Sequence, residues 1–256
     1  MKLNFNAIYT IWLREMTRFF RAKSRVIGSV AMPLFFLVFL GVGFNASVEF
    51  SGMPEGIDYI DFLAPGIIGM ALLFDSISSG LTVLMDKQFG FLKEIMVAPV
   101  DRFSIVAGKT VGGVTTALIQ GILIMLIAFG IGVKMTGFSG FLSAIVFMIL
   151  IAVSFVCLGL IFASKMEDMH GFQLITRLFA FPVFLLSGAF FPMEKLPVWL
   201  QYLTYINPLT YGVDGLRYCL IGITQFSVTL DILALVFFCA LMIILSTYFF
   251  SGIEVD

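Results

Sequence analysis

Residues 139–163 read SGFLSAIVFMILIAVSFVCLGLIFA and contain no charged side chain. A helix of this length is long enough to cross the hydrocarbon core of a bilayer, which is roughly 30 Å thick. Five further apolar stretches lie at 26–44, 62–84, 110–133, 172–191 and 230–250. They are continuous apolar runs, whereas the strands of a membrane barrel alternate apolar and polar residues. The sequence therefore predicts an all-α membrane protein with six transmembrane helices, forming a single domain over residues 1–256.

The composition of the whole chain agrees with a lipid environment. Of its 256 residues, 60% are hydrophobic and 12% are charged, and the mean hydropathy is +1.07. Water-soluble domains do not normally reach such values. The three cysteines, Cys157, Cys219 and Cys239, have no spacing typical of a disulfide framework or a metal site. We expect membrane lipids around the chain and no nucleic-acid partner.

Basic residues near the ends of the predicted spans are distributed unequally, with twelve on one side and three on the other. The three are Lys134, Lys195 and Arg217. The twelve are Lys2, Arg14, Arg18, Arg21, Lys23, Arg25, Lys87, Lys93, Arg102, Lys109, Lys165 and Arg177. Because positive charge stays on the cytoplasmic side, both termini are predicted to be cytoplasmic in a multi-pass protein of the cell membrane.

The first 25 residues have the pattern of an amphipathic helix. Apolar side chains recur every three or four residues on one face, and arginines recur on the opposite face. The apolar face comprises Phe5, Ile8, Trp12, Met16, Phe19 and Phe20, and the basic face comprises Arg14, Arg18, Arg21 and Arg25. This pattern favours an interfacial helix on the cytoplasmic surface, with its arginines toward headgroups and cytosol. The alternative is a soluble tail that only supplies charge for orientation.

The cytoplasmic loop at 86–104 combines mixed charge with a compact apolar patch. The patch consists of Phe89, Phe91, Leu92, Ile95 and Met96. It is predicted to lie on a short helix that ends at the turn before Pro99, since proline lacks the backbone donor and disfavours helical geometry in the preceding residue. Such a helix suits docking into a groove on another protein, and the alternative is a linker that rests on lipid.

No nucleotide-binding motif is present in the sequence. Residues 108–110 read GKT, the end of the phosphate-binding pattern G-x-x-x-x-G-K-[ST], but the first glycine of that pattern would be residue 103, which is Phe103. A membrane span follows at once, and no strand pattern precedes it. Any ATP that this protein uses must therefore be bound by another chain.

Residues 188–229 are rich in aromatic residues and prolines and are too interrupted to span the membrane. They are also too apolar for an ordinary loop. Non-helical backbone at membrane depth occurs where protein or a water-filled cavity covers it, so we expect an external re-entrant hairpin between the fifth and sixth spans. The aromatic residues form either a structural belt at the headgroup level or an external gate over a pathway.

Asp75 lies near the middle of the second predicted span, where a carboxylate costs about 2.5–3.5 kcal/mol. It should face protein or water. It either lines a transport route or pairs across a dimer, or else it is a hydrogen-bonded packing residue. Gly108 and Gly112 have the small-xxx-small spacing that permits close approach of another helix.

The run at 190–217, FFPMEKLPVWLQYLTYINPLTYGVDGLR, resembles the F-P-x-x-x-L-P-x-W-L…N-P-L-T-Y…D-x-x-R signature of ABC-2 type permeases. Residues 90–109 also resemble the coupling region of that family. The likeness covers essentially the whole chain and is greatest for the multidrug or daunorubicin-resistance exporter branch.

The resemblance implies a half-transporter, not an enzyme. Two copies would form the pathway, and a separate ATPase subunit would bind ATP and Mg²⁺, so no cofactor is expected on this chain. The substrate would be an exported amphipathic, lipid-like, drug or glycoconjugate molecule. The implied contacts with the ATPase are Phe91, Leu92, Lys93, Glu94, Ile95, Met96, Pro99 and Arg102. The pathway and gate residues would be Asp75, Phe190, Phe191, Pro192, Trp199, Asn207, Pro208, Tyr211, Asp214 and Arg217.

Two other functions are weighed against an ATP-driven exporter. An ion-coupled secondary carrier often has internal repeats and several buried ionisable groups, whereas Asp75 is the one clearly central group in this sequence. A membrane-embedded enzyme would need a convergent nucleophile and base or a metal cluster. Neither an H-E-x-x-H helix nor a G-x-S-x-G turn is present.

Overall fold

The computed structural model describes residues 4–47, 57–97, 100–134, 136–191, 193 and 196–252. Within these ranges the regular structure is helical and no strand occurs, which confirms the predicted all-α class. The helices are α1 (Phe5–Arg21), α2 (Lys23–Ser47), α3 (Tyr59–Gln88), α4 (Phe91–Val97), α5 (Arg102–Ile131), α6 (Phe138–Lys165), α7 (Met169–Leu185), α8 (Val198–Ile206), α9 (Pro208–Ile221) and α10 (Val228–Ser251).

Four helices of the described residues, α3, α5, α6 and α10, are long and apolar enough to cross a membrane. A fifth span results if α1 and α2, which are bent by 69° relative to each other, are counted as one. Helix α7 has 17 residues and therefore a length of about 25 Å, somewhat less than the hydrocarbon core. Each of the six predicted stretches coincides with most of one helix, while the number of crossings stays a prediction.

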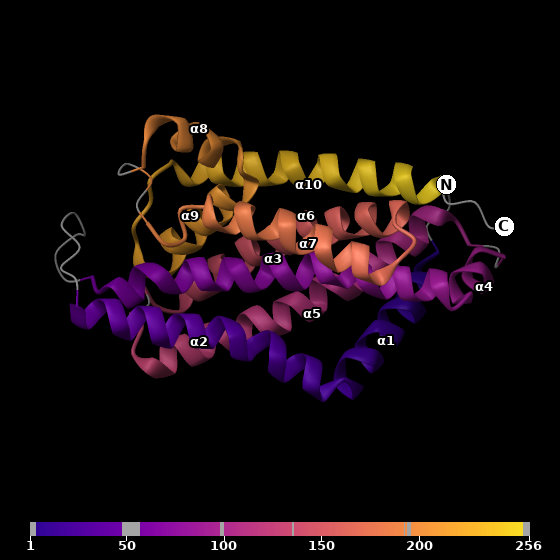
Figure 1. The fold of residues 1–256 in the computed structure, drawn as a ribbon, viewed down its shortest axis with the longest axis horizontal. Helices are drawn as coiled ribbons and strands as arrows, with labels where there is room; N and C mark the ends of the chain where they lie inside the picture. The colour runs from indigo at the N-terminus through magenta and orange to yellow at the C-terminus, as the bar shows by residue number, and fades with distance from the viewer. Residues whose placement is uncertain are drawn as a thin grey trace.

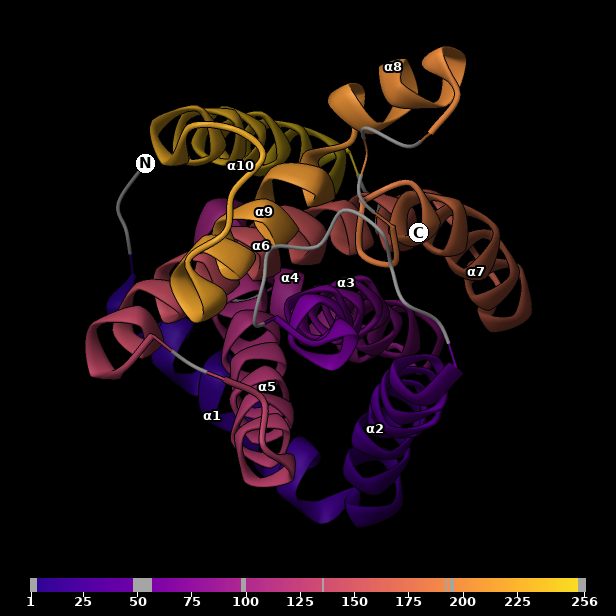
Figure 2. The ribbon, with the colours of Figure 1, turned by 90° about the vertical axis from the view of Figure 1, so that its left-hand side faces the viewer.

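Helix α3 lies at the centre of the bundle, surrounded by α2, α5, α6, α7 and α9 (Figure 2). Being covered on most sides, it buries apolar residues around nearly its whole circumference. It crosses α6 at Gly80 and Gly159, where a Cβ on either glycine would collide with the backbone of the other helix. Small residues at this crossing let the two backbones approach closely.

The bundle is elongated, and different short helices lie at its two ends (Figure 1). Helix α4 and the end of α10 lie at one end, where the Arg102 side chain at the start of α5 donates to the Ser251 carbonyl. Helices α8 and α9 lie at the other, where the backbone N–H of Thr136 donates to the carbonyl of Leu220 at 2.8 Å. We call these the α4 end and the α9 end.

Helix α9 begins and ends where its sequence dictates. The side-chain oxygen of Asn207 accepts the backbone N–H of Leu209 at 3.0 Å, and Pro208 occupies the first helical position, where no intrahelical donor is needed. The helix ends at Gly222, whose φ of 76° is accessible to glycine at little cost. Between α7 and α10 the chain thus forms two short helices, α8 and α9, in place of one long span.

Candidate functional site

Helix α1 packs closely against α5 at two glycines. A Cβ at Gly108 would lie 2.9 Å from Cβ of Ile11, and a Cβ at Gly112 would lie 2.9 Å from Cβ of Glu15. Side chains larger than hydrogen would push the helices apart. The small-xxx-small spacing of these glycines thus corresponds to a close helix contact, as we expected.

A buried charge cluster lies where α1, α3 and α5 meet at the α4 end. The Lys109 ammonium of α5 is 2.5 Å from Glu15 Oε1 of α1 and 2.6 Å from Asp86 Oδ2 of α3. All three side chains are buried, with exposed fractions of 1%, 8% and 1% for Lys109, Glu15 and Asp86. Because each charge is expensive without a partner, the three helices are held in a mutual arrangement that satisfies them. We call Glu15, Asp86 and Lys109 the three-helix cluster.

Two arginines of α1 join this cluster from its solvent side. Arg14 donates two hydrogen bonds to Asp86, at 2.9 and 2.8 Å, and Arg18 donates one at 2.9 Å. The Arg14 guanidinium also lies 3.5 Å from the ring centroid of Phe91 on α4. A continuous set of contacts therefore connects α4 with α1, α3 and α5.

The orientation of α1 differs from the one expected for a helix lying on lipid. Met16 and Phe19 are buried against the bundle, while Phe5 and Phe20 are exposed. The expected apolar face is therefore divided, because Glu15 lies between Ile11 and Phe19 on the side that packs on α5.

Helix α4 is held to the bundle by part of its apolar patch. Leu92 is buried with Val83 and Leu84 of α3, and Ile95 and Met96 are half-buried against the same group. The strongly exposed side chains near this helix are Phe89, at 75%, and Val97, at 82%, and Glu94 is exposed as well. Of the other predicted contact residues, Arg102 is exposed, and Pro99 and the side chain of Lys93 lie outside the described residues.

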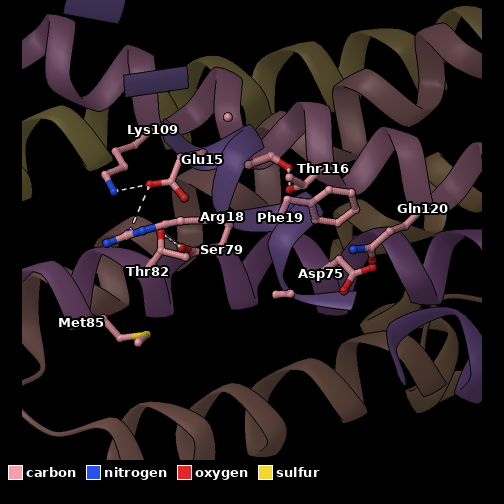
Figure 3. Close-up of a pocket in the computed structure, with 13 residues that line it drawn as sticks. Glu15, Arg18, Phe19, Asp75, Ser79, Thr82, Met85, Lys109, Thr116 and Gln120 are labelled. Carbon is pink, nitrogen blue, oxygen red and sulfur yellow. Dashed lines mark hydrogen bonds and ion pairs between the residues drawn. The ribbon is translucent and has the colours of Figure 1, made fainter. Parts of the chain in front are cut away.

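Asp75 lies at one end of a polar cavity of about 290 Å³ between α1, α3 and α5 (Figure 3). Glu15 and Lys109 lie at the opposite end of the same cavity. With the Gln120 amide placed so that its nitrogen faces the carboxylate, it donates to Asp75 Oδ1 at 2.8 Å and to Ser29 Oγ at 3.0 Å. Asp75, Gln120 and Ser29 therefore connect α3, α5 and α2. Asp75 therefore faces protein through its hydrogen bonds to Gln120 and also lines a polar cavity, as we expected for a carboxylate at this depth.

At the α9 end, the predicted signature residues fix the path of the chain. The guanidinium of Arg217 donates to the Gly188 carbonyl at 2.9 Å and lies 3.9 Å from the ring centroid of Phe62. Asp214, one turn earlier on α9, accepts the backbone N–H groups of Gln225 and Phe226 at 3.0 and 2.9 Å. These contacts join α9 to the segments before and after it.

Asn207 and the buried charges of α9 act together as an anchor. The Asn207 amide donates to the Val183 carbonyl of α7 at 2.6 Å. Arg217 and Asp214 are both buried, and Nη1 of Arg217 lies 3.9 Å from Oδ1 of Asp214. We call Asn207, Asp214 and Arg217 the α9 anchor.

The remaining predicted gate residues lie around this anchor but do not form one compact site. Phe190 is half-buried against Phe184, with ring centroids 5.0 Å apart, whereas Phe191 and Trp199 are exposed. The Tyr211 hydroxyl donates to the Tyr205 carbonyl at 2.7 Å. Pro192 lies outside the described residues.

Sequence reasoning did not identify the three-helix cluster or Gln120. One signal was available, because Glu15 sits four residues from both Ile11 and Phe19 and so lies on the packed face of its helix. The charge distribution places Lys109, next to Gly108 and three residues before Gly112, among the residues of the cytoplasmic surface. A charge beside a close helix contact is a candidate for burial with a partner.

The fold defines the class of protein: a multi-pass helical membrane protein. Residues 6–221 match the ABC-2 type transporter family. The chain is 30% identical over 231 residues to the inner membrane transport permease YadH of Escherichia coli strain K12, which covers 88% of this chain and 87% of YadH. It is 32% identical over 160 residues to the "Probable multidrug ABC transporter permease YbhR" of the same organism, which covers 62% of this chain and 43% of YbhR.

The chain therefore belongs to the ABC-2 type transporter family. It is a transport permease of the cell membrane and not an enzyme. Membership of the family implies an ABC transporter with a partner ATPase. The resemblance of its signature residues to this family is thereby confirmed.

Proposed function

We propose that this chain is the membrane half-subunit of an ATP-driven exporter. Two copies form the pathway, and a separate ATPase subunit, which binds ATP and Mg²⁺, docks on α4. The observation that carries this proposal is the way α4 is mounted: Leu92 is buried against the bundle, while Val97 at the end of α4 and Phe89, two residues before it begins, are exposed. A helix with one buried and one exposed apolar side suits a groove on a partner protein.

The α4 end is the cytoplasmic end in this proposal, with both termini on that side. The support is the concentration of basic residues there, including Arg14, Arg18, Lys87 and Arg102. Cytoplasmic segments of membrane proteins carry such an excess of Lys and Arg. The hairpin at 188–229 then faces outward, re-enters the membrane and closes the pathway from the external side.

Coupling follows from the contacts that connect α4 with the bundle. Closure of the ATPase dimer displaces α4, and the displacement passes through Phe91 and Arg14 to Asp86 and the three-helix cluster. Movement of α1, α3 and α5 then reaches the outer hairpin through α3, which contacts α9 directly.

The cargo is an amphipathic molecule, a class that includes lipids, drugs and glycoconjugates.

The experiment compares the same substitution at two exposed valines on opposite ends of the molecule. Val97→Asp, on α4, should reduce ATPase binding and permease-stimulated ATP hydrolysis about tenfold, because a charge replaces an apolar contact at an interface. Val198→Asp, on α8, is the matched control and should leave ATPase binding unchanged. Both variants should keep the unfolding temperature of the parent, since both side chains are exposed.

Transport by vesicles that contain the permease alone, driven by an ion gradient, would contradict the proposal and favour a secondary carrier. Equal ATPase binding by both valine variants and the parent would remove α4 as the docking element.

A further inference from the structure

The polar cavity between α1, α3 and α5 presents hydrogen-bond acceptors. Its three hydroxyl groups each donate their proton to a backbone carbonyl of their own helix: Ser79 to Ser76 at 2.7 Å, Thr82 to Ser79 at 2.8 Å and Thr116 to Gly113 at 2.9 Å. A hydroxyl group has one proton and two lone pairs, so each oxygen has lone pairs left to accept another bond.

The charged donors that line this cavity lie at its Glu15 end and have carboxylate partners there, although the Arg18 guanidinium keeps further N–H groups. Lys109 is bound to Glu15 and Asp86, and Arg18 is bound to Asp86. The amide nitrogen of Gln120 donates to Asp75 and Ser29, which leaves the amide oxygen as an acceptor. At the Asp75 end, the Asp75 carboxylate, the Gln120 amide oxygen and the Thr116 hydroxyl therefore offer acceptors to a ligand head that carries N–H donors and a positive charge.

A second, apolar cavity of about 410 Å³ adjoins the first at Asp75. It lies between α2, α3 and α7 and is lined mainly by Met32, Phe36, Met70, Phe74 and Phe181, with Asp75 and Arg177 as its charged residues. Asp75 lines both cavities, and its hydrogen-bonded partner Gln120 lines the polar one while Ser29 lines the apolar one. A polar and an apolar compartment that share one carboxylate are complementary to an amphipathic molecule.

We propose that these two cavities form one binding site for amphipathic amines, in which the ammonium head lies in the polar cavity beside Asp75 and the apolar body lies between α2, α3 and α7. This inference rests on the proposed export function and specifies a substrate class for it. Asp75 and the oxygen of Thr116 contact the head, and Phe36, Phe74 and Phe181 contact the apolar body. The Gln120 bridge to Asp75 and Ser29 separates the compartments until the head displaces it.

The test uses photoreactive probes on the permease in complex with its ATPase, reconstituted in nanodiscs. Three probes share one diazirine-bearing dodecyl chain and differ in the head, which is an amine, an alcohol or a phosphate. The amine probe should label peptides of α2, α3 or α7, and excess unlabelled dodecylamine should compete. Asp75→Asn should lower this labelling about tenfold or more, because it removes the charge and keeps the shape.

Two further variants serve as a second test of the polar cavity and as a control outside it. Thr116→Val removes one cavity acceptor at nearly constant volume and should lower labelling by the amine probe several-fold, even where Asp75→Asn does not fold. Glu167→Gln removes an exposed acid outside both cavities and should leave labelling unchanged.

Equal labelling by the three probes, or amine labelling that neither Asp75→Asn nor Thr116→Val reduces, would overturn this assignment. ATP hydrolysis that still depends on the permease would in that case leave the proposed transport function standing. Failure of the permease to bind any ATPase would count against the function itself, whatever the probes show.

Discussion

Both ends of the bundle bury charged side chains, but they use them in different ways. In the three-helix cluster, Lys109 meets Glu15 and Asp86, which lie 94 and 23 residues away and on other helices. In the α9 anchor, Asp214 and Arg217 belong to one helix, and their hydrogen bonds go mainly to backbone groups of the adjoining segments.

This difference separates contacts that can report movement from contacts that fix a conformation. Side chains that bridge three helices exchange or lose partners when one helix moves, so the cluster is sensitive to the relative positions of α1, α3 and α5. Hydrogen bonds from α9 to the backbone of its own neighbours hold the chain path whether or not the helices shift. We expect the α9 anchor to determine stability and the three-helix cluster to determine coupling.

The largest effect is predicted for Arg217→Met. It leaves the Gly188 carbonyl without its donor and Asp214 without the neighbouring positive charge, in a place with 1% exposure. Removing one member of a buried charge pair should lower the free energy of unfolding by about 3–5 kcal/mol. The measurement is denaturant unfolding of the purified permease in detergent micelles.

Lys134→Met is the control for this prediction. Lys134 lies 4.0 Å from Asp61 at the same end of the bundle, but its side chain is 61% exposed. Its loss should change stability by less than about 1 kcal/mol because solvent screens the pair. A similar loss of stability in both variants would mean that burial does not distinguish them and that the α9 anchor has no special role.

A smaller loss, about 2–3 kcal/mol, is predicted for Lys109→Met. The substitution leaves Glu15 and Asp86 buried, but Arg14 and Arg18 still neutralise Asp86. Combining it with Glu15→Leu should restore part of the stability, since apolar residues often replace a buried ion pair without cost. Unfolding of the two single variants and the double variant gives the coupling energy, and strictly additive losses would contradict the contact.

The sequence was sufficient for the fold class and for the existence of most helices because apolar runs determine both. Asn207 and Asp214 are singled out through the resemblance of their motif to the family signature, which predicts them at a gate, whereas their contacts as a helix cap and a loop-closing carboxylate come from the structure. The three-helix cluster could not be predicted in this way. Glu15, Asp86 and Lys109 meet through packing of α1 on α5. The spacing of Glu15 from Ile11 and Phe19 marks it as a candidate for burial, but it does not identify its partners on α3 and α5.

The packing of α1 on α5 can be tested with the substitution Gly112→Val. The added side chain would meet Glu15 and move α1 away from α5, at a cost of about 1–2 kcal/mol. Gly130→Ala, on the same helix with open space around it, should be neutral or stabilising by up to about 1 kcal/mol, because alanine favours helix. Denaturant unfolding of both variants measures the difference, and equal stability of Gly112→Val and Gly130→Ala would contradict the close approach.

The smallest effect on stability, below about 1 kcal/mol, is predicted for Arg14→Gln. Asp86 keeps Arg18 and Lys109, and Arg14 is partly exposed, so its loss is inexpensive. The same side chain, however, covers the ring of Phe91 and so connects α4 with the cluster. The variant should bind the ATPase normally and hydrolyse ATP with the permease bound, yet export less cargo per ATP. An unchanged ratio of export to hydrolysis would show that α4 moves the bundle by a route other than Arg14, through the packing of Leu92 on α3.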